Sequence, residues 1–318
     1  MLLSRAADGL YWIARYLERA EHTARLVDVG LDLGLGRPDA TTRRAADRLY
    51  ATLGFAGVLD GPIERAPLVG AALFDLAHRS SMASCVTAAR ENGRQVREEI
   101  SSDMWEQLNA LFLAVRQIQT HGDRRERAPS ICRTVIAGIH LFQGLTDATM
   151  GHGEGWQYLQ AGRFIERAAS TAALIDAFVA DQAIAEGGRL EQIDWIALLR
   201  SCAALEAYCR HYTADVRPER VTEFLLLSAD FPRSVRFATA RLESALLAIA
   251  RAGGRDTGGR ADRLAGRLHS SLDYGQVDEI LNDDPRAYLA GIGAQCGQIH
   301  SALYQSYIAY PIESAIPA

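Results

Sequence analysis

Apolar residues recur along this chain at the spacing of an α-helix. Between residues 10 and 28, Ile13, Leu17 and Ala24 fall on one face, while Arg15 and Glu18 fall on the opposite face. The same pattern predicts further helices at residues 83–100, 104–119, 131–149, 158–180, 192–212, 234–251 and 286–308. Alternating runs of β-branched residues between hairpin turns are missing, so no strand is predicted. We expect an all-α fold, a helical bundle with no significant β-sheet.

Glycine, proline and polar residues mark the ends of these helices. The stretch from Gly30 to Pro38 is expected to end the first helix, and the polar residues 121–130 are expected to link two others. Pro285 suits the first turn of a helix, because the N–H that proline lacks is unpaired there anyway. Asp284 before it is a plausible N-cap.

The chain repeats one of its helices. When residues 15–28 are placed over residues 163–176, eight of fourteen positions are identical. Unrelated amphipathic helices share apolar positions through their common period, but they have no reason to share charged pairs as well. The simplest interpretation is an internal duplication within one domain, residues 1–318, with pseudo-symmetric halves at approximately 1–150 and 151–318.

Charge and composition exclude several classes of function. The net charge is −5, which argues against a dedicated nucleic-acid-binding protein, since such proteins usually carry a basic stripe. All 34 basic residues are arginine. A lysine-free chain has no phosphate-binding P-loop lysine, no Schiff-base lysine and no Ser-Lys dyad. Arginine can still clamp carboxylates or phosphates through its planar fork of donors.

The cysteines and the N-terminal segment suggest a cytoplasmic protein. The five cysteines are scattered and never spaced as C-x-x-C, so we expect reduced and mostly buried thiols. The N-terminus lacks the basic and apolar regions of a signal peptide, and no run of about 18 apolar residues is present to span a membrane. The cysteines are Cys85, Cys132, Cys202, Cys209 and Cys296.

The motif Arg-x-x-Glu-Arg occurs once in each repeat and is the first candidate site. Neighbouring helical residues point about 100° apart, so Glu18 and Arg19 cannot pair with each other. Within its own helix Glu18 can reach Arg15, and Glu166 can reach Arg163. The second arginine of each motif lies at the edge of the apolar face, where it can reach another helix. The motif is interpreted either as a structural ion pair between helices or as a functional site. The candidate residues are Arg15, Glu18, Arg19, Arg163, Glu166 and Arg167.

Two further groups could bind an anion. Arg90, Arg94 and Arg97 are predicted to follow one face of a helix, with Glu91 on a neighbouring face. Such a row suits an anionic ligand or an acidic partner helix, although a solvated charged face has the same pattern.

The second group is Arg233 with Ser234, which the sequence places on the first turn of a helix. Free N–H groups favour anions there, although an ordinary helix start is the alternative. Neither Glu-x-x-His pairs, paired cysteines nor a Gly-x-Ser-x-Gly elbow occurs, so no metal site, cofactor or catalytic residue is assigned.

Four segments together resemble the bacterial alpha-E family, named for its helical fold and its Glu-Arg motif. They occur in the family's order and span nearly the whole chain, at residues 4–26, 89–109, 154–168 and 223–237. The resemblance implies an association with a circularly permuted ATP-grasp-type ligase and a transglutaminase-like protein, because genes of the family often neighbour or are fused to theirs. A peptide-synthesis or peptide-modification system is therefore implied.

Three functions follow as hypotheses. The first is a non-catalytic accessory protein that binds the ligase or its peptide substrate through a Glu/Arg-lined surface between the two halves. The second is an enzyme acting on a peptide or amino-acid derivative, with Glu18 and Glu166 as acid and base and Arg19, Arg167 or Arg90 holding a carboxylate. It requires a shared pocket and a raised carboxylate pKa. The third is a structural helical scaffold tied by the Glu-Arg pairs. The sequence leaves the oligomeric state open.

Overall fold

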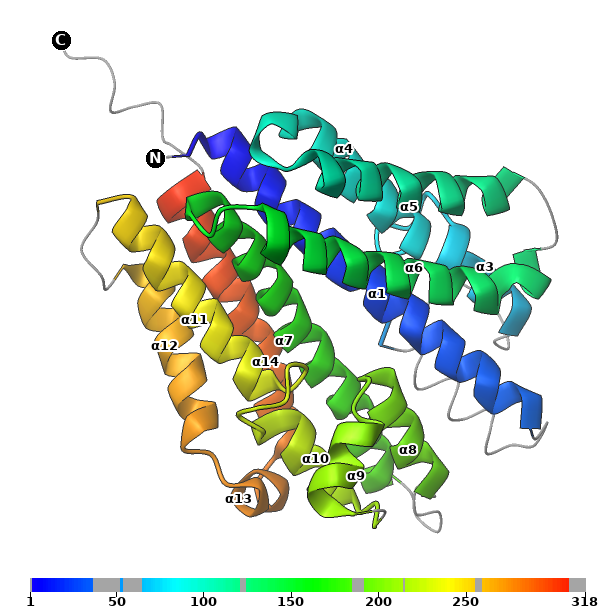
Figure 1. The fold of residues 1–318 in the computed structure, drawn as a ribbon. Helices are drawn as coiled ribbons and strands as arrows, with labels where there is room; N and C mark the ends of the chain where they lie inside the picture. The colour runs from blue at the N-terminus through cyan, green and yellow to red at the C-terminus, as the bar shows by residue number, and fades with distance from the viewer. Residues whose placement is uncertain are drawn as a thin grey trace.

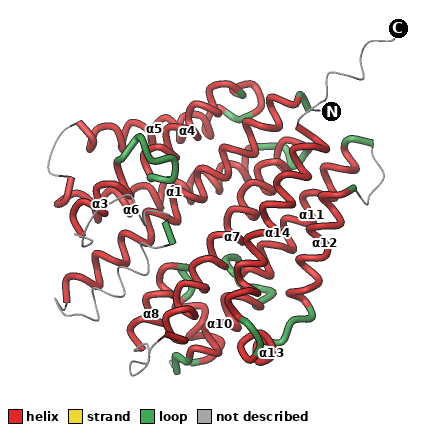
Figure 2. Tube along the Cα trace, turned by 180° about the vertical axis from the view of Figure 1, so that it is seen from behind, coloured by secondary structure: helices red, strands yellow, loops and turns green. Residues whose placement is uncertain are grey.

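The computed structural model describes residues 2–36, 52–53, 65–120, 124–184, 192–213, 215–254 and 259–308. Throughout these residues the secondary structure consists of helices joined by turns and loops, without a strand (Figure 2). The predicted all-α bundle is confirmed for this part of the chain. None of the described helices combines the length and the apolar character needed to cross a membrane.

The N-terminal helices form one group. They are α1 (Ser4–Gly36), α3 (Arg65–Phe74), α4 (Met82–Gln95), a short 3₁₀ turn (Arg97–Glu99), α5 (Ser102–Thr120) and α6 (Arg124–Thr149). The long helix α1 packs against α4 and α6, and α5 packs against the same two helices from the other side (Figure 1). The result is a four-helix arrangement, with α3 lying beside α4 and α6.

The C-terminal helices form a second group. They are α7 (Glu154–Ile184), α8 (Gln192–Ser201), α9 (Leu205–Tyr212), α10 (Pro218–Leu227), α11 (Val235–Ala252), α12 (Arg260–Asp273), α13 (Val277–Asn282), α14 (Pro285–Leu303) and a π-helical turn (Tyr304–Ile308). Here α7 packs against α11 and α14, and α12 packs against those two. The two groups meet where α1 lies along α7 (Figure 1).

The packing order is the same in both groups. Helices α1, α4, α5 and α6 contact one another in the pattern that α7, α11, α12 and α14 follow. The Ser81 and Ser234 side chains cap α4 and α11 and accept hydrogen bonds from the backbone N–H groups of Ser84 at 3.1 Å and Phe237 at 3.0 Å. An internal duplication would produce this correspondence, but the duplication and its boundary near residue 150 stay predictions.

Helix α1 ends inside the stretch from Gly30 to Pro38 that the sequence predicts as its end. It continues past Gly30, and its last helical residue is Gly36. A glycine inside a helix costs only about 1 kcal/mol relative to alanine. Leu31 and Leu33, which follow it, pack against the core, and burial of such side chains outweighs that cost.

Helix α6 starts earlier than predicted. Residues 124–130, assigned to a polar linker by the sequence, belong to its first turns even though Pro129 lies among them. One missing N–H near the start of a 26-residue helix is a small loss. At other ends the sequence rules hold, since the Asp284 side chain accepts from the Ala287 N–H at 2.9 Å and caps α14.

Helices α3, α10, α12 and α13 lie outside the predicted ranges. The single helix predicted over residues 192–212 is interrupted between Ser201 and Leu205, so it forms α8 and α9.

The prediction of one helix over residues 83–100 is wrong. Helix α4 ends at Gln95, and the following residues form the 3₁₀ turn. The Val96 N–H bonds to the Asn92 carbonyl at 3.1 Å, and the Glu99 N–H then bonds to the Val96 carbonyl at 3.0 Å. Val96 and Ile100 are both buried, so the chain turns here to place both side chains in the core.

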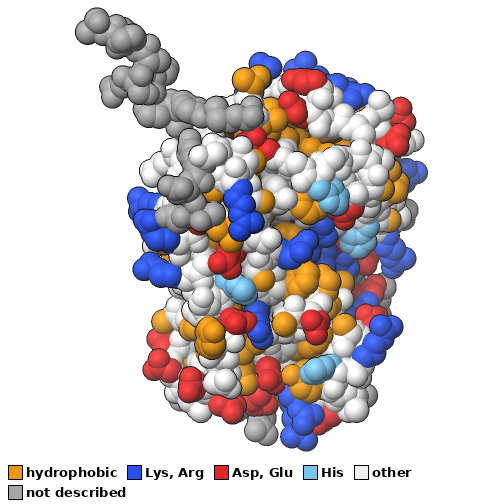
Figure 3. Space-filling model, turned by 60° about the vertical axis from the view of Figure 1, so that its left-hand side comes forward, with side chains coloured by type: hydrophobic (Ala, Val, Ile, Leu, Met, Phe, Trp, Pro, Cys, Tyr) orange, Lys and Arg blue, Asp and Glu red, His pale blue; other side chains and the backbone are white. Residues whose placement is uncertain are grey.

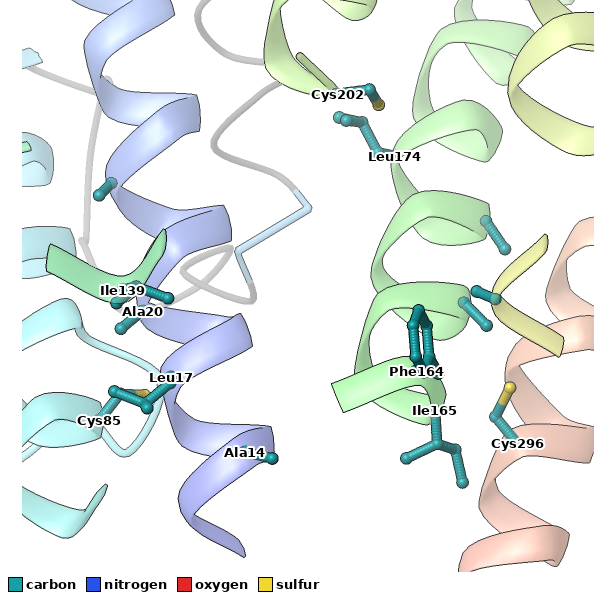
Figure 4. Packing of buried hydrophobic residues seen from close by; sticks show 14 of the residues in the cluster. Ala14, Leu17, Ala20, Cys85, Ile139, Phe164, Ile165, Leu174, Cys202 and Cys296 are labelled. Carbon is teal, nitrogen blue, oxygen red and sulfur yellow. The ribbon is translucent and has the colours of Figure 1, made fainter. Parts of the chain in front are cut away.

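One apolar core runs through both helix groups. Ala14, Leu17 and Ala20 lie along α1, and Phe164 and Ile165 lie on α7 (Figure 4). Small side chains along α1 allow neighbouring helices to approach it closely. The expected reduced and mostly buried cysteines are confirmed, since all five are free thiols and four of them are buried.

Helices α1 and α7 come especially close at Gly162. A Cβ atom added at this position would lie 2.2 Å from the Tyr11 carbonyl oxygen and 3.3 Å from the Ala14 Cβ atom. Only glycine fits there without moving the α1 backbone. The contact therefore holds the charged residues of α1 opposite those of α7.

Candidate functional site

The two Glu-Arg motifs bond to each other across the interface between α1 and α7. Arg167 donates from Nε to Glu18 Oε1 at 2.5 Å and from Nη2 to Glu18 Oε2 at 2.8 Å. Glu166 accepts from Arg19 Nε at 2.6 Å and from Arg15 Nε at 2.7 Å. The glutamate of each motif thus pairs with the second arginine of the other motif.

The prediction of ion pairs within each helix is therefore wrong. The described contacts of Glu18 do not include Arg15, and those of Glu166 do not include Arg163. A two-pronged arginine–carboxylate bond is stronger than a neutral hydrogen bond, and the dry interface adds to it. A pair three residues apart on an exposed helix face contributes only a few tenths of a kcal/mol.

These carboxylates are ionised in the folded protein. The side chains of Glu18 and Arg167 are each 3% exposed. Burial alone would raise the pKa of Glu18, but the guanidinium groups of Arg167 and Arg233 outweigh it and hold the pKa below its ordinary value. Burial opposes the charge of Glu166 in the same way, and Arg15 and Arg19 lower its pKa. Both shifts are opposite to the raised carboxylate pKa that the enzyme hypothesis requires.

A third glutamate, Glu21, belongs to the same group, although the sequence analysis did not single it out. Its side chain is fully buried and accepts from Arg25 Nη2 at 2.5 Å. His140 Nε2 lies 2.9 Å from the same carboxylate oxygen, which also bonds to Arg233. Arg233 Nη1 lies 3.6 Å from Glu18 Oε1 and so connects the two glutamates.

The burial of Glu21 could have been predicted from the sequence. It comes four residues after Leu17 and three before Ala24, so it lies on the apolar face of α1. A charge on a buried face indicates a buried partner. The partner itself, Arg233, lies 212 residues away and is brought there by packing.

The turn before α11 aims Arg233 into the interface. Ser234 is the N-cap of α11, so Arg233 precedes the helix and does not lie on its first turn as predicted. Arg167 Nη1 donates to the Pro232 carbonyl at 3.0 Å, and the Thr171 hydroxyl donates to the Arg233 carbonyl at 3.4 Å. These bonds from α7 fix the backbone on both sides of the Arg233 side chain.

We call these residues the central cluster. It contains six guanidinium groups and three carboxylates, and therefore an excess of positive charge. Its members are Arg15, Glu18, Arg19, Glu21, Arg25, Arg163, Glu166, Arg167 and Arg233.

Arg163 is the arginine of the central cluster that makes no hydrogen bond or ion pair with the described residues. Its Nε is buried and unpaired. The Nε of Arg25 is unpaired as well, but Arg25 bonds to Glu21 through Nη2. Burial, with Arg167 next in effect, lowers its pKa to about 10, which still leaves it charged at neutral pH. Its guanidinium lies 5.2 Å from the centre of the Phe164 ring.

Arg90, Glu91 and Arg94 lie on α4 and do not join the central cluster. Arg90 Nε donates to Asn109 Oδ1 at 3.0 Å, and its guanidinium lies over the Trp105 ring at 5.3 Å. Arg94 pairs with Glu91 at the surface, with Nε 2.8 Å from the carboxylate. Arg97, expected on the same helix face, lies in the 3₁₀ turn after α4. The structure thus brings together Arg19, Arg167 and Arg233 but not Arg90.

The described residues line several pockets, of which three bear on the candidate site. One lies beside the central cluster and includes Arg163, one follows α12, and one lies between α7, α10, α13 and α14. None of the three is lined by Glu18 or Glu166. The described residues also contain no group of three or more His, Cys, Asp or Glu side chains that could hold a metal ion.

Comparison with known proteins places this chain among relatives of unassigned function. It is 25% identical to an uncharacterised protein of Mycobacterium bovis and to uncharacterised proteins of two strains of Mycobacterium tuberculosis, over 341 aligned positions. These alignments cover 96% of this chain but 37% of each relative, so the chain spans little more than a third of their length. No solved structure matches.

This all-helical chain contains two Glu-Arg motifs whose carboxylates are buried. The family description that matches residues 2–308 is a predicted alpha-helical domain with a conserved ER motif. Glu18-Arg19 and Glu166-Arg167 are the two ER pairs of this sequence that bond to each other. The chain belongs to the Alpha-E family.

Proposed function

We propose that this chain is a non-catalytic accessory protein of a peptide-synthesis or peptide-modification system. Its first candidate partner is an ATP-grasp-type ligase, and a transglutaminase-like protein and the peptide itself are further candidates. The observation that carries the proposal is the mutual pairing of the Glu-Arg motifs. Their carboxylates and guanidinium groups bond to one another inside the molecule.

The pairing favours an accessory role over the enzyme hypothesis. An acid or base needs a carboxylate that faces substrate and has a pKa close to the working pH. Glu18 and Glu166 are buried, each is held by two arginines, and each has a lowered pKa. None of the cavities described above is lined by either side chain.

The relatives also favour an accessory role. In the mycobacterial proteins the region similar to this chain makes up 37% of a longer polypeptide. In those relatives the similar region is joined to further sequence in one polypeptide. Such an arrangement is expected of a protein that acts together with a partner. The face of the molecule seen in Figure 3 mixes basic, acidic and apolar side chains, with basic ones in its middle and along its edges. Such a mixed surface suits a protein or peptide partner better than a nucleic acid.

A structural scaffold is the second candidate function, and the reciprocal ion pairs favour it. They connect α1 to α7 and, through Arg233, to the turn before α11. Buried ion pairs of this kind fix the register of neighbouring elements. Under this hypothesis the Glu-Arg motifs stabilise the fold, and any partner binds elsewhere.

Co-purification tests the accessory role directly. The tagged chain is mixed with the ATP-grasp-type ligase of the same organism, and retention is compared with and without the peptide product of the ligase. Retention of either supports the proposal. A chain that remains folded by circular dichroism but retains neither would overturn it.

A variant separates the two candidates. Glu18→Gln is expected to lower the melting temperature and, when assayed well below that temperature, to leave ligase retention unchanged if the motif is only a tie. Loss of retention in the folded variant would show that the motif itself contributes to the contact. Arg94→Gln is a control, because Arg94 pairs with Glu91 at the surface.

A further inference from the structure

Arg163 is the guanidinium of the central cluster that no described residue satisfies. The other five arginines each donate at least one hydrogen bond to a carboxylate of the cluster. No ion pair or hydrogen bond joins Arg163 to any described residue, and its Nε is buried. Buried donors are nearly always paired with protein, water or a ligand, so this group calls for a partner.

The surroundings of Arg163 supply more positive than negative charge. Arg167 and Arg233 repel it, and Glu18 attracts it while being held by those same two arginines. Asp147 on α6 attracts it more weakly, and its Oδ1 accepts a hydrogen bond from Trp156 Nε1 at 3.2 Å. An anion at this point would therefore meet an uncompensated cation.

A small pocket leads to this guanidinium from between α1, α6 and α7. Its free volume is about 20 Å³, enough for a group the size of one water molecule. Gln143 and Gln160 contribute amide groups that no described residue hydrogen-bonds, while the Thr146 hydroxyl donates to the Phe142 carbonyl at 2.8 Å. The pocket is lined by Ala14, Leu17, Phe142, Gln143, Thr146, Leu159, Gln160 and Arg163.

Arg163 shares an aromatic neighbour with a second cation, Arg241 on α11. The guanidinium of Arg241 is 6.0 Å from the centre of the Phe164 ring, which Arg163 approaches to 5.2 Å. Arg241 is exposed and makes no ion pair with the described residues. It can attract an anion from solvent toward the half-buried Arg163.

We infer that this pocket binds a carboxylate group, such as an acidic side chain or a chain terminus of a peptide. The planar fork of Arg163 matches the two oxygens of a carboxylate, and the Gln143 and Gln160 amides can donate to the same group. The free volume admits one carboxylate oxygen beside the guanidinium, so the rest of the ligand would lie at the mouth of the pocket. The inference goes beyond the proposed function and does not rest on it, because the site is built whatever the partner is.

Acetate is the probe for the test, with acetamide as the neutral probe of the same shape. The protein is labelled with nitrogen-15, and the Nε–H resonances of its arginines are followed at constant ionic strength while acetate replaces chloride. The resonance that disappears in Arg163→Gln belongs to Arg163. We expect it to shift along a saturable curve with acetate and to stay in place with acetamide. The Arg94 resonance, already paired with Glu91, is the internal control.

Substitutions at the pocket complete the test. Gln143→Ala and Arg241→Gln are expected to weaken acetate binding, and removal of the Arg163 charge is expected to weaken it by at least about tenfold. The two milder variants keep the test decisive should Arg163→Gln fail to fold, because the arginine Nε–H resonance whose response to acetate is weakened by Gln143→Ala then identifies Arg163.

Three results would overturn the inference. They are a linear Arg163 shift that matches the Arg94 shift, equal shifts with acetamide, and tighter binding of inorganic phosphate than of acetate. The acetate titration needs no ligase, so its failure is distinct from failure of the co-purification experiment.

Discussion

Glu18 on α1 accepts two hydrogen bonds from Arg167 on α7, 149 residues away in the sequence, and both side chains are buried. A carboxylate and a guanidinium placed face to face in this way can bond well only at one register of the two helices. The neighbouring pair of Arg19 and Glu166 repeats the bond in the opposite direction. The two pairs together fix both the rotation and the sliding of α1 against α7.

Removing one partner of this buried pair is expected to be costly. Arg167→Gln leaves Glu18 buried with only the longer contact to Arg233, so the free energy of unfolding should fall by about 3–5 kcal/mol. Urea denaturation followed by circular dichroism measures it. Arg94→Gln, at the surface, should unfold like the unsubstituted chain. Equal midpoints for the two variants would show that the buried pair does not hold the helices together.

The crossing of α1 and α7 should not accept a methyl group. In Gly162→Ala the new Cβ would meet the Tyr11 carbonyl at 2.2 Å, and backbone cannot yield as a side chain can. We expect a loss of about 1–3 kcal/mol or more in the free energy of unfolding.

Gly144→Ala is the matched control for that substitution. Gly144 also lies inside a helix, but a Cβ there meets nothing within 4 Å. It should gain up to about 1 kcal/mol from the better helix propensity of alanine. If thermal melts of both variants shift in the same direction, close packing at Gly162 is not the cause.

Mild acid should destabilise the protein through His22. Burial, with the Arg233 guanidinium next in effect, lowers the pKa of His22 to about 4, whereas an unfolded histidine titrates near 6.5. Between these values the unfolded chain binds more protons. The stability is therefore complete above about pH 6.5 and is lost as the pH falls toward 4, by at most about 1.4 kcal/mol per pH unit.

His22→Gln should flatten this pH dependence. The measurement is the free energy of unfolding in urea at several pH values above 4.5, where the carboxylates with lowered pKa values stay charged. His300, whose pKa burial also lowers, accounts for part of the remaining slope. Identical slopes in the variant and the unsubstituted chain would contradict the prediction.

Most of the thiols should be inert in the folded protein. Burial raises the pKa of Cys85, Cys202 and Cys296 to about 12, and thiolate is the reactive form. Iodoacetamide followed by peptide mass mapping should modify the half-buried Cys209 first and the others only in urea. Labelling of Cys85 at the rate of Cys209 in the native state would mean that the core opens readily.

The local elements of this protein could be predicted from its sequence. The spacing of Ile13, Leu17 and Ala24 predicts a helix because helical periodicity is a property of neighbouring residues. Helix caps such as Asp284 can be predicted for the same reason, because the capping bond joins residues close together in the sequence. At Gly30 the helix continues, because the burial of the following side chains in the core outweighs the weak local preference of glycine.

The partners of the charged residues were decided by the tertiary structure alone. The repeat pattern singled out Glu18, Arg19, Glu166 and Arg167, and all four proved to be paired at one interface. Their spacing on a single helix suggested pairs three residues apart instead. Which charge meets which depends on how α1 crosses α7, and that crossing depends on core packing and on the absence of a side chain at Gly162.

The difference is clearest for Arg163 and Arg15, which hold equivalent positions in the two repeats. The sequence presents them as the same residue of the same motif. In the folded chain Arg15 bonds to Glu166, whereas no described residue bonds to Arg163, which lines a pocket between three helices. A repeated sequence specifies a repeated helix, because helix formation depends on neighbouring residues. The contacts of that helix depend on the whole fold. Equivalent residues of the two repeats therefore have different neighbours and can bind different groups.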